Sequence, residues 1–392
     1  MTSVVGGVRA RSMLSALTGL RAFAAAWVVL YHFRADIKLL MPRSEPVWPL
    51  MDSGYAGVDV FFVLSGFIIT YTYLEQLKEP GRATTMRFLG FRLARIYPVH
   101  LFTLAVFAVI VTPGSITGVG PADIWRNIAS TDFVRQLVLI HGWGWDGNRA
   151  WNYPAWSISS EWMAYLAFPA VALMLGRVRT LATAGAGLIA AHAFNIASFL
   201  LIARLGQEGD IIGVRIVGEF LAGCFLLLVW RRGWAADARW DRITPAFAIA
   251  SVVGTVAANE IGSIAPVLAA PLYCGLIYGL ALERDVLSRW LSLRWAVYAG
   301  EASYGLYMTH AVVQRFVWEY LPSGDYLGSN IVVRGGVLLL YALLLAVAAV
   351  ATYEAIEKPA RVLVRKLTLS VVAKPGGEPS VVDAATAGTR QA

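Results

Sequence analysis

Ionisable residues fall inside or at the edge of long apolar runs, among them Arg21, His32, Asp59, Glu161 and His310. Because a charge at membrane depth is costly, each of them is a functional candidate. Arg21 and His32 are eleven residues apart, so a helix places them on one face about 16 Å from each other. The rise along each expected helix places the other three at the level of His32, toward the outside. An imidazole beside carboxylates suits general-base chemistry on a hydroxyl group.

Basic residues form a second layer at the inner side. Arg92 and Arg95 are about one turn apart at the expected inner start of a helix over 96–112, near the depth of Arg21. Guanidinium groups bind phosphate oxygens through paired hydrogen bonds, so this layer suits a phosphate-bearing ligand. From position alone, ordinary anchoring by the positive-inside rule explains Arg92 and Arg95 equally well.

Structural roles compete with function at the outer level. His310 follows Tyr307 by three residues and could form a simple hydrogen bond between helices. Asp59 could cap or orient a neighbouring group. His32 is harder to explain structurally, because Arg21 lies on its face and carboxylates lie at its level, so we favour a functional role for it.

The composition indicates where these residues lie. The chain has 392 residues, 58% of them hydrophobic and 15% charged, with a mean hydropathy of +0.61. This is more apolar than a soluble domain allows, and it predicts an all-α polytopic membrane helix bundle. Ten runs are candidate spans: 17–33, 56–74, 96–112, 158–175, 181–202, 211–230, 243–258, 264–282, 296–317 and 331–352. The seventh run is short and carries Pro245, so it could be re-entrant.

The basic residues predict the orientation of the bundle. With the N-terminus inside, 22 of the 33 Lys and Arg residues fall in cytoplasmic segments and 9 in external ones. This bias predicts ten helices with both termini in the cytoplasm. The expected parts are a cytoplasmic segment 1–16, a membrane domain 17–366 with a long external loop 113–157, and a disordered cytoplasmic tail 367–392.

Reporter fusions test this topology. A reporter fused after Gly144 is expected to respond as external, and one fused after Gly233 as cytoplasmic, because of the uneven distribution of basic residues. The measurement is the activity of paired reporters that work on opposite sides of the membrane. The reverse pattern at either site would contradict the two levels of polar residues.

Seven runs in order resemble the acyltransferase-3 family of bacterial membrane O-acyltransferases. They are 17–22 with His32, 57–67, 92–98, 156–161, 215–223, 302–310 and 353–359. The family includes O-antigen acetylases and acylases of exopolysaccharides, Nod factors and antibiotic sugars. The first run carries its Arg-x10-His pattern, and Glu357 in the last run matches its Ile-Glu-Lys-Pro turn. The likeness spans most of the chain.

The resemblance implies roles for individual residues. His32 corresponds to the catalytic histidine of the family, and Arg92 with Arg95 to its acyl-CoA site. Ser157 and Glu161 match the Ser-x-x-x-Glu element of the family. The inward position of the Ile-Glu-Lys-Pro turn argues against direct chemistry between that turn and His32.

We therefore expect an enzyme of the cell inner membrane that transfers an acyl group, with acetyl favoured, from acyl-CoA to a carbohydrate hydroxyl. His32 is expected to be the general base, with Asp59 or Glu161 fixing its tautomer. Acyl-CoA is then a co-substrate, and no bound cofactor, metal or nucleic acid is expected. The expected substrate-binding residues are Arg21, Arg92, Arg95, Ser157, Tyr307 and His310.

Three other functions fit helices with charged residues at depth. A proton-coupled secondary transporter is disfavoured by the basic inner layer and by the lack of an internal repeat. A scaffold for glycan assembly would bind carbohydrate but tolerate the loss of His32. An unrelated family of membrane-bound O-acyltransferases also uses an intramembrane histidine, and the order of the seven runs disfavours it.

Overall fold

The computed structural model describes residues 15–79, 81–114, 131–143, 151–204, 211–233, 239–261, 265–320 and 330–372, and these contain helices but no strand. The α-helices are α2 (Ser15–His32), α3 (Arg34–Leu40), α4 (Trp48–Asp52), α5 (Gly57–Leu77), α6 (Arg82–Gly114), α8 (Thr131–Leu137), α9 (Trp156–Arg177), α10 (Leu181–Arg204), α11 (Ile211–Arg231), α12 (Trp240–Ile261), α13 (Ala265–Leu282), α14 (Val286–Leu291), α15 (Arg294–Tyr320), α16 (Ile331–Thr352) and α17 (Lys358–Val372). Short 3-10 turns are η1 (Pro42–Val47), η2 (Gly54–Ala56) and η3 (Tyr153–Ala155), and η5 (Tyr353–Glu357) is a π-helical turn.

The all-α class is confirmed, and helices occupy all ten expected positions. Among the described residues, six helices are long and apolar enough to cross a membrane, and a seventh is added if the bent pair α2 and α3 is one span. A shorter apolar helix covers Val267–Leu282. Helices α11 and α15 fall outside this set. Both pack against several other helices of the bundle, where polar residues find protein partners.

Helix α12 covers the seventh run, for which a span and a re-entrant segment were both open. It has 22 residues and belongs to the helices that are long and apolar enough to span. Pro245 lies in its second turn. Because the proline is close to the helix start, most of the backbone hydrogen-bond ladder continues past it.

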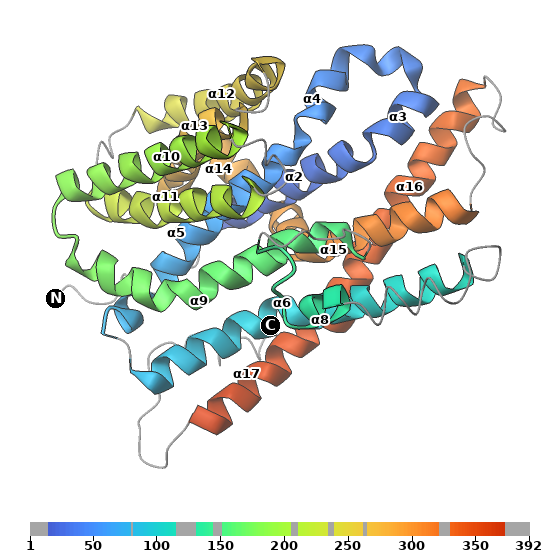
Figure 1. Ribbon diagram of the computed structural model, residues 1–392. Coiled ribbons are helices and arrows are strands. Elements are labelled where there is room, and N and C mark those ends of the chain that lie inside the picture. The colour runs from blue at the N-terminus through green and yellow to red at the C-terminus, as the bar shows by residue number, and fades with distance from the viewer. Residues whose placement is uncertain are drawn as a thin grey trace.

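Helix α6 is 33 residues long, far longer than the expected helix over 96–112. Arg92 and Arg95 therefore lie inside this helix and not at its start. Helix α17 packs along α6 (Figure 1), where the guanidinium of Arg365 lies 5.6 Å from the ring centre of Phe91. Helix α17 continues to Val372, six residues past the expected boundary at 366. The remainder of the expected tail lies outside the described residues.

Part of the expected external loop 113–157 is packed on the bundle. The Tyr97 hydroxyl donates to the carbonyl of Leu137 at 2.9 Å, and His100 Nε2 donates to the carbonyl of Gln136 at 2.9 Å. Burial lowers the pKa of His141 to about 4, so this ring is neutral at pH 7. Its ring lies parallel to that of His100, with centres 5.7 Å apart.

Glycines allow the central helices to touch through their backbones. A Cβ at Gly66 of α5 would lie 2.0 Å from the carbonyl oxygen of Phe220, and a Cβ at Gly223 of α11 would lie 2.0 Å from that of Val63. At Gly300 of α15, a Cβ would lie 1.8 Å from the carbonyl oxygen of Thr18 on α2. Small residues at such crossings are typical of membrane bundles. The α2 to α15 crossing holds together the two helices that carry His32 and His310.

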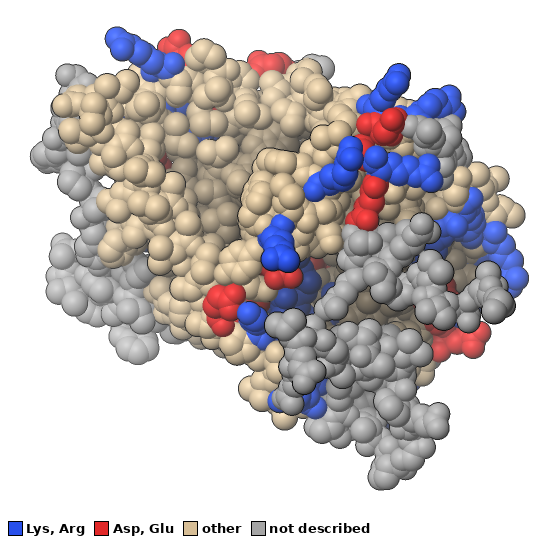
Figure 2. Space-filling model, turned by 180° about the vertical axis from the view of Figure 1, so that it is seen from behind, with Lys and Arg blue, Asp and Glu red and all other residues tan. Residues whose placement is uncertain are grey.

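The surface agrees with a membrane location. Figure 2 shows a broad face without charged side chains, with Lys and Arg gathered mostly toward one end. Exposed apolar residues on the described helices include Ile189, Ile249, Val332 and Val347. An uncharged outer band is what a lipid-facing bundle requires.

Candidate active site

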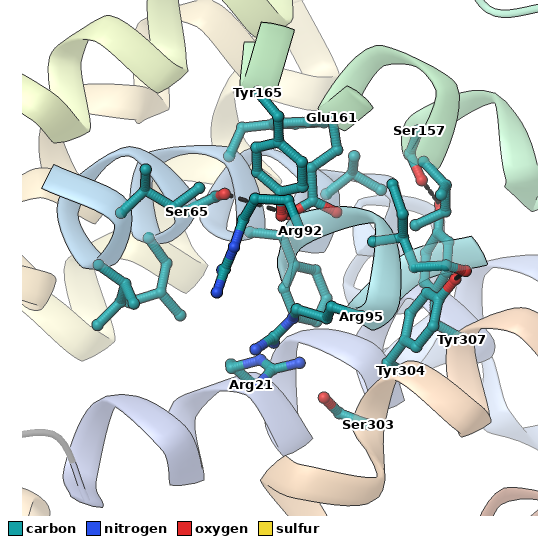
Figure 3. A pocket seen from close by; sticks show the side chains of 18 of the residues that line it. Arg21, Ser65, Arg92, Arg95, Ser157, Glu161, Tyr165, Ser303, Tyr304 and Tyr307 are labelled. Atoms are coloured by element: carbon teal, nitrogen blue, oxygen red, sulfur yellow. Dashed lines mark hydrogen bonds between the residues drawn. The ribbon is translucent and has the colours of Figure 1, made fainter. Parts of the chain in front are cut away.

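A cavity of about 200 Å³ lies between helices α2, α5, α6, α9 and α15. Its walls are apolar side chains with polar groups between them (Figure 3). The polar residues that line it are Thr18, Arg21, Ser65, Arg92, Arg95, Ser157, Glu161, Tyr165, Ser303, Tyr304 and Tyr307. The cavity therefore brings together residues that the sequence analysis placed at two depths of the membrane, the inner basic layer and the outer level.

Three arginines converge on this cavity (Figure 3). Arg92 Nη2 donates to the Tyr73 hydroxyl at 2.8 Å. The Arg92 guanidinium also lies 4.9 Å from the ring centre of Tyr73 and 5.9 Å from that of Tyr165, which orients it by cation–π attraction. Arg21 from α2 and Arg95 from α6 complete the group. The sequence placed Arg21 near the depth of Arg92 and Arg95, and all three line this cavity.

Glu161 lies in the arginine cavity. The Ser65 hydroxyl donates to Glu161 Oε1 at 3.2 Å, and the Tyr165 hydroxyl donates to the same oxygen. Its carboxylate is close enough to Arg21 to act on that charge. The count along separate helices missed this because Arg92 and Arg95 lie well inside α6, which brings the basic group to the depth of Glu161.

The cavity arginines have two further charged neighbours. Glu357, at the end of the π-helical turn, is buried and forms an ion pair with Arg361 on the next turn. Both act electrostatically on Arg21 and Arg95. Sequence reasoning counted Arg361 only as a cytoplasmic basic residue. Its i,i+4 spacing from Glu357 was the available signal.

His32 and His310 are in direct contact close to this cavity. His32 is the last residue of α2, at the 63° bend into α3. His310 Nε2 lies 3.1 Å from His32 Nδ1, and the two rings are stacked with centres 4.8 Å apart. His310 Nδ1 lies 2.6 Å from the carbonyl oxygen of Tyr307. The ring of Tyr153 contacts both imidazoles.

The cavity ends next to this histidine pair. The Ser157 hydroxyl donates to the Tyr307 hydroxyl at 2.8 Å, and Tyr307 donates in turn to the carbonyl of Pro154 at 3.2 Å. Both hydroxyls line the cavity. The backbone carbonyl of Tyr307 also accepts from His310, which lies one helical turn further along α15. The histidine pair is therefore one helical turn from the cavity wall.

Asp59 is fully buried on α5 but is not among the residues that line the cavity. The ring contacts described for His32 are with Tyr31, Tyr153 and His310. Of these rings, that of His310 is stacked on the His32 ring.

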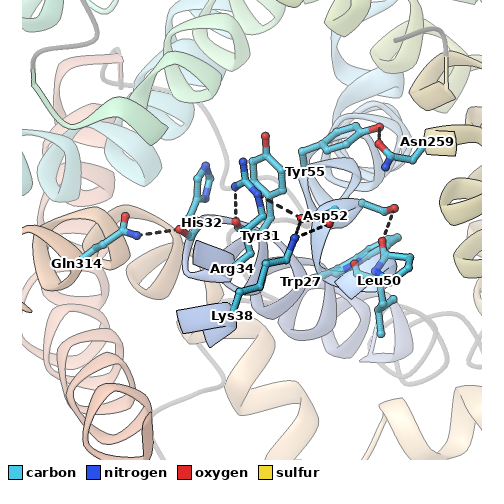
Figure 4. Close-up of polar contacts among 12 residues, drawn as sticks. Trp27, Tyr31, His32, Arg34, Lys38, Leu50, Asp52, Tyr55, Asn259 and Gln314 are labelled. Carbon is cyan, nitrogen blue, oxygen red and sulfur yellow. Dashed lines mark hydrogen bonds and ion pairs between the residues drawn. The ribbon is translucent and has the colours of Figure 1, made fainter. Parts of the chain in front are cut away.

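A different carboxylate lies near His32. Gln314 Nε2 donates to the backbone carbonyl of His32 at 2.8 Å and to Asp36 Oδ2 at 3.3 Å (Figure 4 shows the contact with His32). The Tyr153 hydroxyl donates to Gln314 Oε1 at 3.0 Å. Sequence reasoning missed Asp36 because the bend after His32 turns α3 back over the bundle.

Hydrogen bonds and ion pairs connect the residues around His32 (Figure 4). Asp52 accepts from Lys38 Nζ at 2.7 Å and lies 3.4 Å from Arg34 Nε. The Tyr55 hydroxyl donates to Asn259 Oδ1 at 3.1 Å. The segment between α2 and α5 is thus held over the outer end of the site.

Among the described residues, no three His, Cys, Asp or Glu side chains are placed to hold a metal ion. The arrangement instead provides a basic cavity for an anion and, one helical turn beyond its wall, an imidazole pair. Within a bundle of apolar helices, these features fit an enzyme that moves a group from a phosphate-bearing donor.

Comparison with known proteins identifies the class. The model of a family described as acyltransferase domain matches residues 14–353, and the chain belongs to this family, so it is a membrane acyltransferase. The resemblance to the acyltransferase-3 family is confirmed, and the transporter and scaffold alternatives are set aside.

Two relatives share most of the chain. The acyltransferase MdmB of Streptomyces mycarofaciens is 26% identical over 332 residues, which cover 77% of this chain and 79% of MdmB. The O-acetyltransferase OatA of Staphylococcus aureus is 24% identical over 392 residues, which cover 89% of this chain and 57% of OatA. The chain thus spans little more than half of OatA. No solved structure matches.

Proposed function

We propose that this acyltransferase moves an acyl group, with acetyl favoured, from acyl-CoA to a carbohydrate hydroxyl, with His32 as general base. The observation that carries the proposal is the cavity that runs from three arginines to the wall beside the His32 and His310 pair. The name of OatA, an O-acetyltransferase, supports acetyl as the group.

The donor fits the basic end of the cavity. The arginines Arg21, Arg92 and Arg95 suit the phosphates of CoA, because guanidinium groups bind phosphate oxygens in pairs of hydrogen bonds. The nucleotide then stays at the arginine end while the thioester lies farther along the cavity.

The chemistry uses one proton and one bond exchange. His32 Nε2 accepts the proton of the acceptor hydroxyl while the hydroxyl oxygen attacks the thioester carbonyl carbon. The tetrahedral intermediate expels the CoA thiolate as the carbon–sulfur bond breaks, and the imidazolium returns the proton to the sulfur. Ser157 and Tyr307 line the cavity close to this point, and donation to the carbonyl oxygen requires one of these hydroxyls to turn away from its present acceptor.

The carboxylates take supporting roles in this proposal. Glu161 sits among the arginines with Ser65 and Tyr165, so we assign it to arranging the donor site. Asp59 is buried on α5 beside the cavity wall, and we place it in support of that wall. His310 contacts His32 directly, which favours a role beside the base over the substrate-binding role expected from the sequence.

The proposal includes a topology. Ten spans in the cell inner membrane with both termini cytoplasmic place the arginines toward the side where acyl-CoA is made. The helical rise of about 16 Å between Arg21 and His32 separates the arginines that bind the donor from the general base. An acceptor glycan then meets the thioester from outside, without crossing the membrane.

Transfer is therefore expected with the two substrates on opposite sides. Sealed, oriented vesicles receive acetyl-CoA only on the cytoplasmic face. An impermeant oligosaccharide, released from the surface glycan of a strain without the gene, is supplied only on the other face. Acetylated oligosaccharide should form, as measured by mass spectrometry, and the His32→Ala variant should form none. Product that appears only when both substrates share the cytoplasmic face would exclude the reach-through arrangement.

A further inference from the structure

Both ring nitrogens of His310 are occupied by defined partners. Nδ1 lies 2.6 Å from the backbone carbonyl oxygen of Tyr307. A carbonyl oxygen only accepts, so Nδ1 of His310 must carry a proton and donate it. Nε2 of His310 lies 3.1 Å from Nδ1 of His32.

This contact bears on the tautomer of His32, together with the backbone carbonyl of Val28, which also accepts from this ring. His310 is fully buried, and burial disfavours the charged imidazolium. A neutral imidazole carries one N–H, so Nε2 of His310 has a free lone pair and accepts. Nδ1 of His32 must therefore be the donor, and the lone pair of His32 is left on Nε2.

We propose that His310 is a positioning residue that holds His32 in the tautomer protonated on Nδ1, which keeps Nε2 of His32 ready as the base. This inference rests on the proposed function. It also assigns different roles to the two histidines, because both ring nitrogens of His310 are engaged and neither is left to bind a substrate. His310 then does the work expected of Asp59 or Glu161.

The backbone packing around the pair supports this role. Gly300 lets α15 touch the backbone of α2 at Thr18. At the other end of the contact, Gln314 of α15 donates to the backbone carbonyl of His32. The Tyr153 ring centre lies 4.8 Å from that of His32. The two imidazoles are thus held by helix packing as well as by their own hydrogen bond.

Nitrogen NMR of histidine-labelled protein in lipid nanodiscs tests the inference directly. The chain has 5 histidines, and the shift of each ring nitrogen reports whether it carries a proton. The signal of His32 is assigned by its loss in His32→Ala. His310→Gln keeps an acceptor oxygen near the position of Nε2, whereas His310→Leu removes it. Wild type and His310→Gln should show His32 protonated on Nδ1, and His310→Leu should move proton population to Nε2.

Gln314→Leu is the matched control for this spectrum. It lies on the same helix and removes a hydrogen bond to the backbone of His32, but it leaves the ring contact intact. The His32 tautomer should be unchanged in it. An unchanged tautomer in His310→Leu, or the same change in Gln314→Leu, would overturn the inference.

Kinetics supply the second readout. With acetyl-CoA and acceptor-bearing membranes of a strain without the gene, His310→Leu should lower kcat by about 10- to 100-fold. The KM for acetyl-CoA should stay within about two-fold, because the donor site is not touched. His310→Gln should recover most of kcat. If wild type transfers nothing from acetyl-CoA, the proposed function fails, while the NMR result still decides the role of His310.

Discussion

Replacement of His32 by alanine is expected to lower kcat for acyl transfer by about 10²- to 10⁴-fold. The substitution removes the Nε2 lone pair that takes the hydroxyl proton, and no other nitrogen of the histidine pair is free to replace it. The fold should persist, because the ring of His32 is only half-buried. The measurement is the rate of acetylated product and of CoA release, with the melting temperature as a check on folding.

His192→Ala is the control for this variant. His192 is another half-buried imidazole in a membrane helix, and its described partner is the Cys274 thiol at 3.6 Å on α13. It does not line the cavity. Its loss should leave kcat close to wild type. Wild-type turnover by a folded His32→Ala protein would exclude the proposed base.

Replacement of both Arg92 and Arg95 by glutamine is expected to raise the apparent KM for acyl-CoA by about 10²- to 10⁴-fold. Charge-assisted hydrogen bonds of the kind proposed for the CoA phosphates contribute about 1.5–3 kcal/mol each. Glutamine keeps most of the side-chain volume without the charge. Lysine at both positions should restore only part of the affinity, because an ammonium lacks the paired N–H groups of a guanidinium.

Arg365→Gln serves as the comparison for the double variant. Arg365 also lies beside α6, over the ring of Phe91, but it does not line the cavity. Its loss should leave the KM for acyl-CoA near wild type. The measurement is initial rate against acyl-CoA concentration in the same vesicles. An unchanged KM in the folded double glutamine variant would refute the donor site.

The sequence by itself determined the helical elements and the family. Long apolar runs predicted the helix positions, because burial in lipid demands internally bonded helices of about 20 residues. The run 331–352 agrees with α16 at both ends. The spacing of Arg21 and His32 on one helix was also readable, since both belong to a single rigid α2. Seven motif runs in order then identified the family, which the comparison confirmed.

The motif glycines show that a single run of sequence does not predict how two helices pack. Gly66 and Gly223 belong to separate runs of the family resemblance, yet each is required because the backbone of the other helix passes against it. A glycine in one helix does not indicate which helix it meets. The crossing appears only when α5 and α11 are packed together.

Only the tertiary structure decided which side chains share a site. Arg92 lies inside the long helix α6, and Glu161 lines the same cavity as the arginines. The crossing of α2 with α15 set His310, and not a carboxylate, against His32. Distances along one helix follow from a constant rise per residue. Contacts between helices depend on tilt, rotation and crossing point, which many residues determine together.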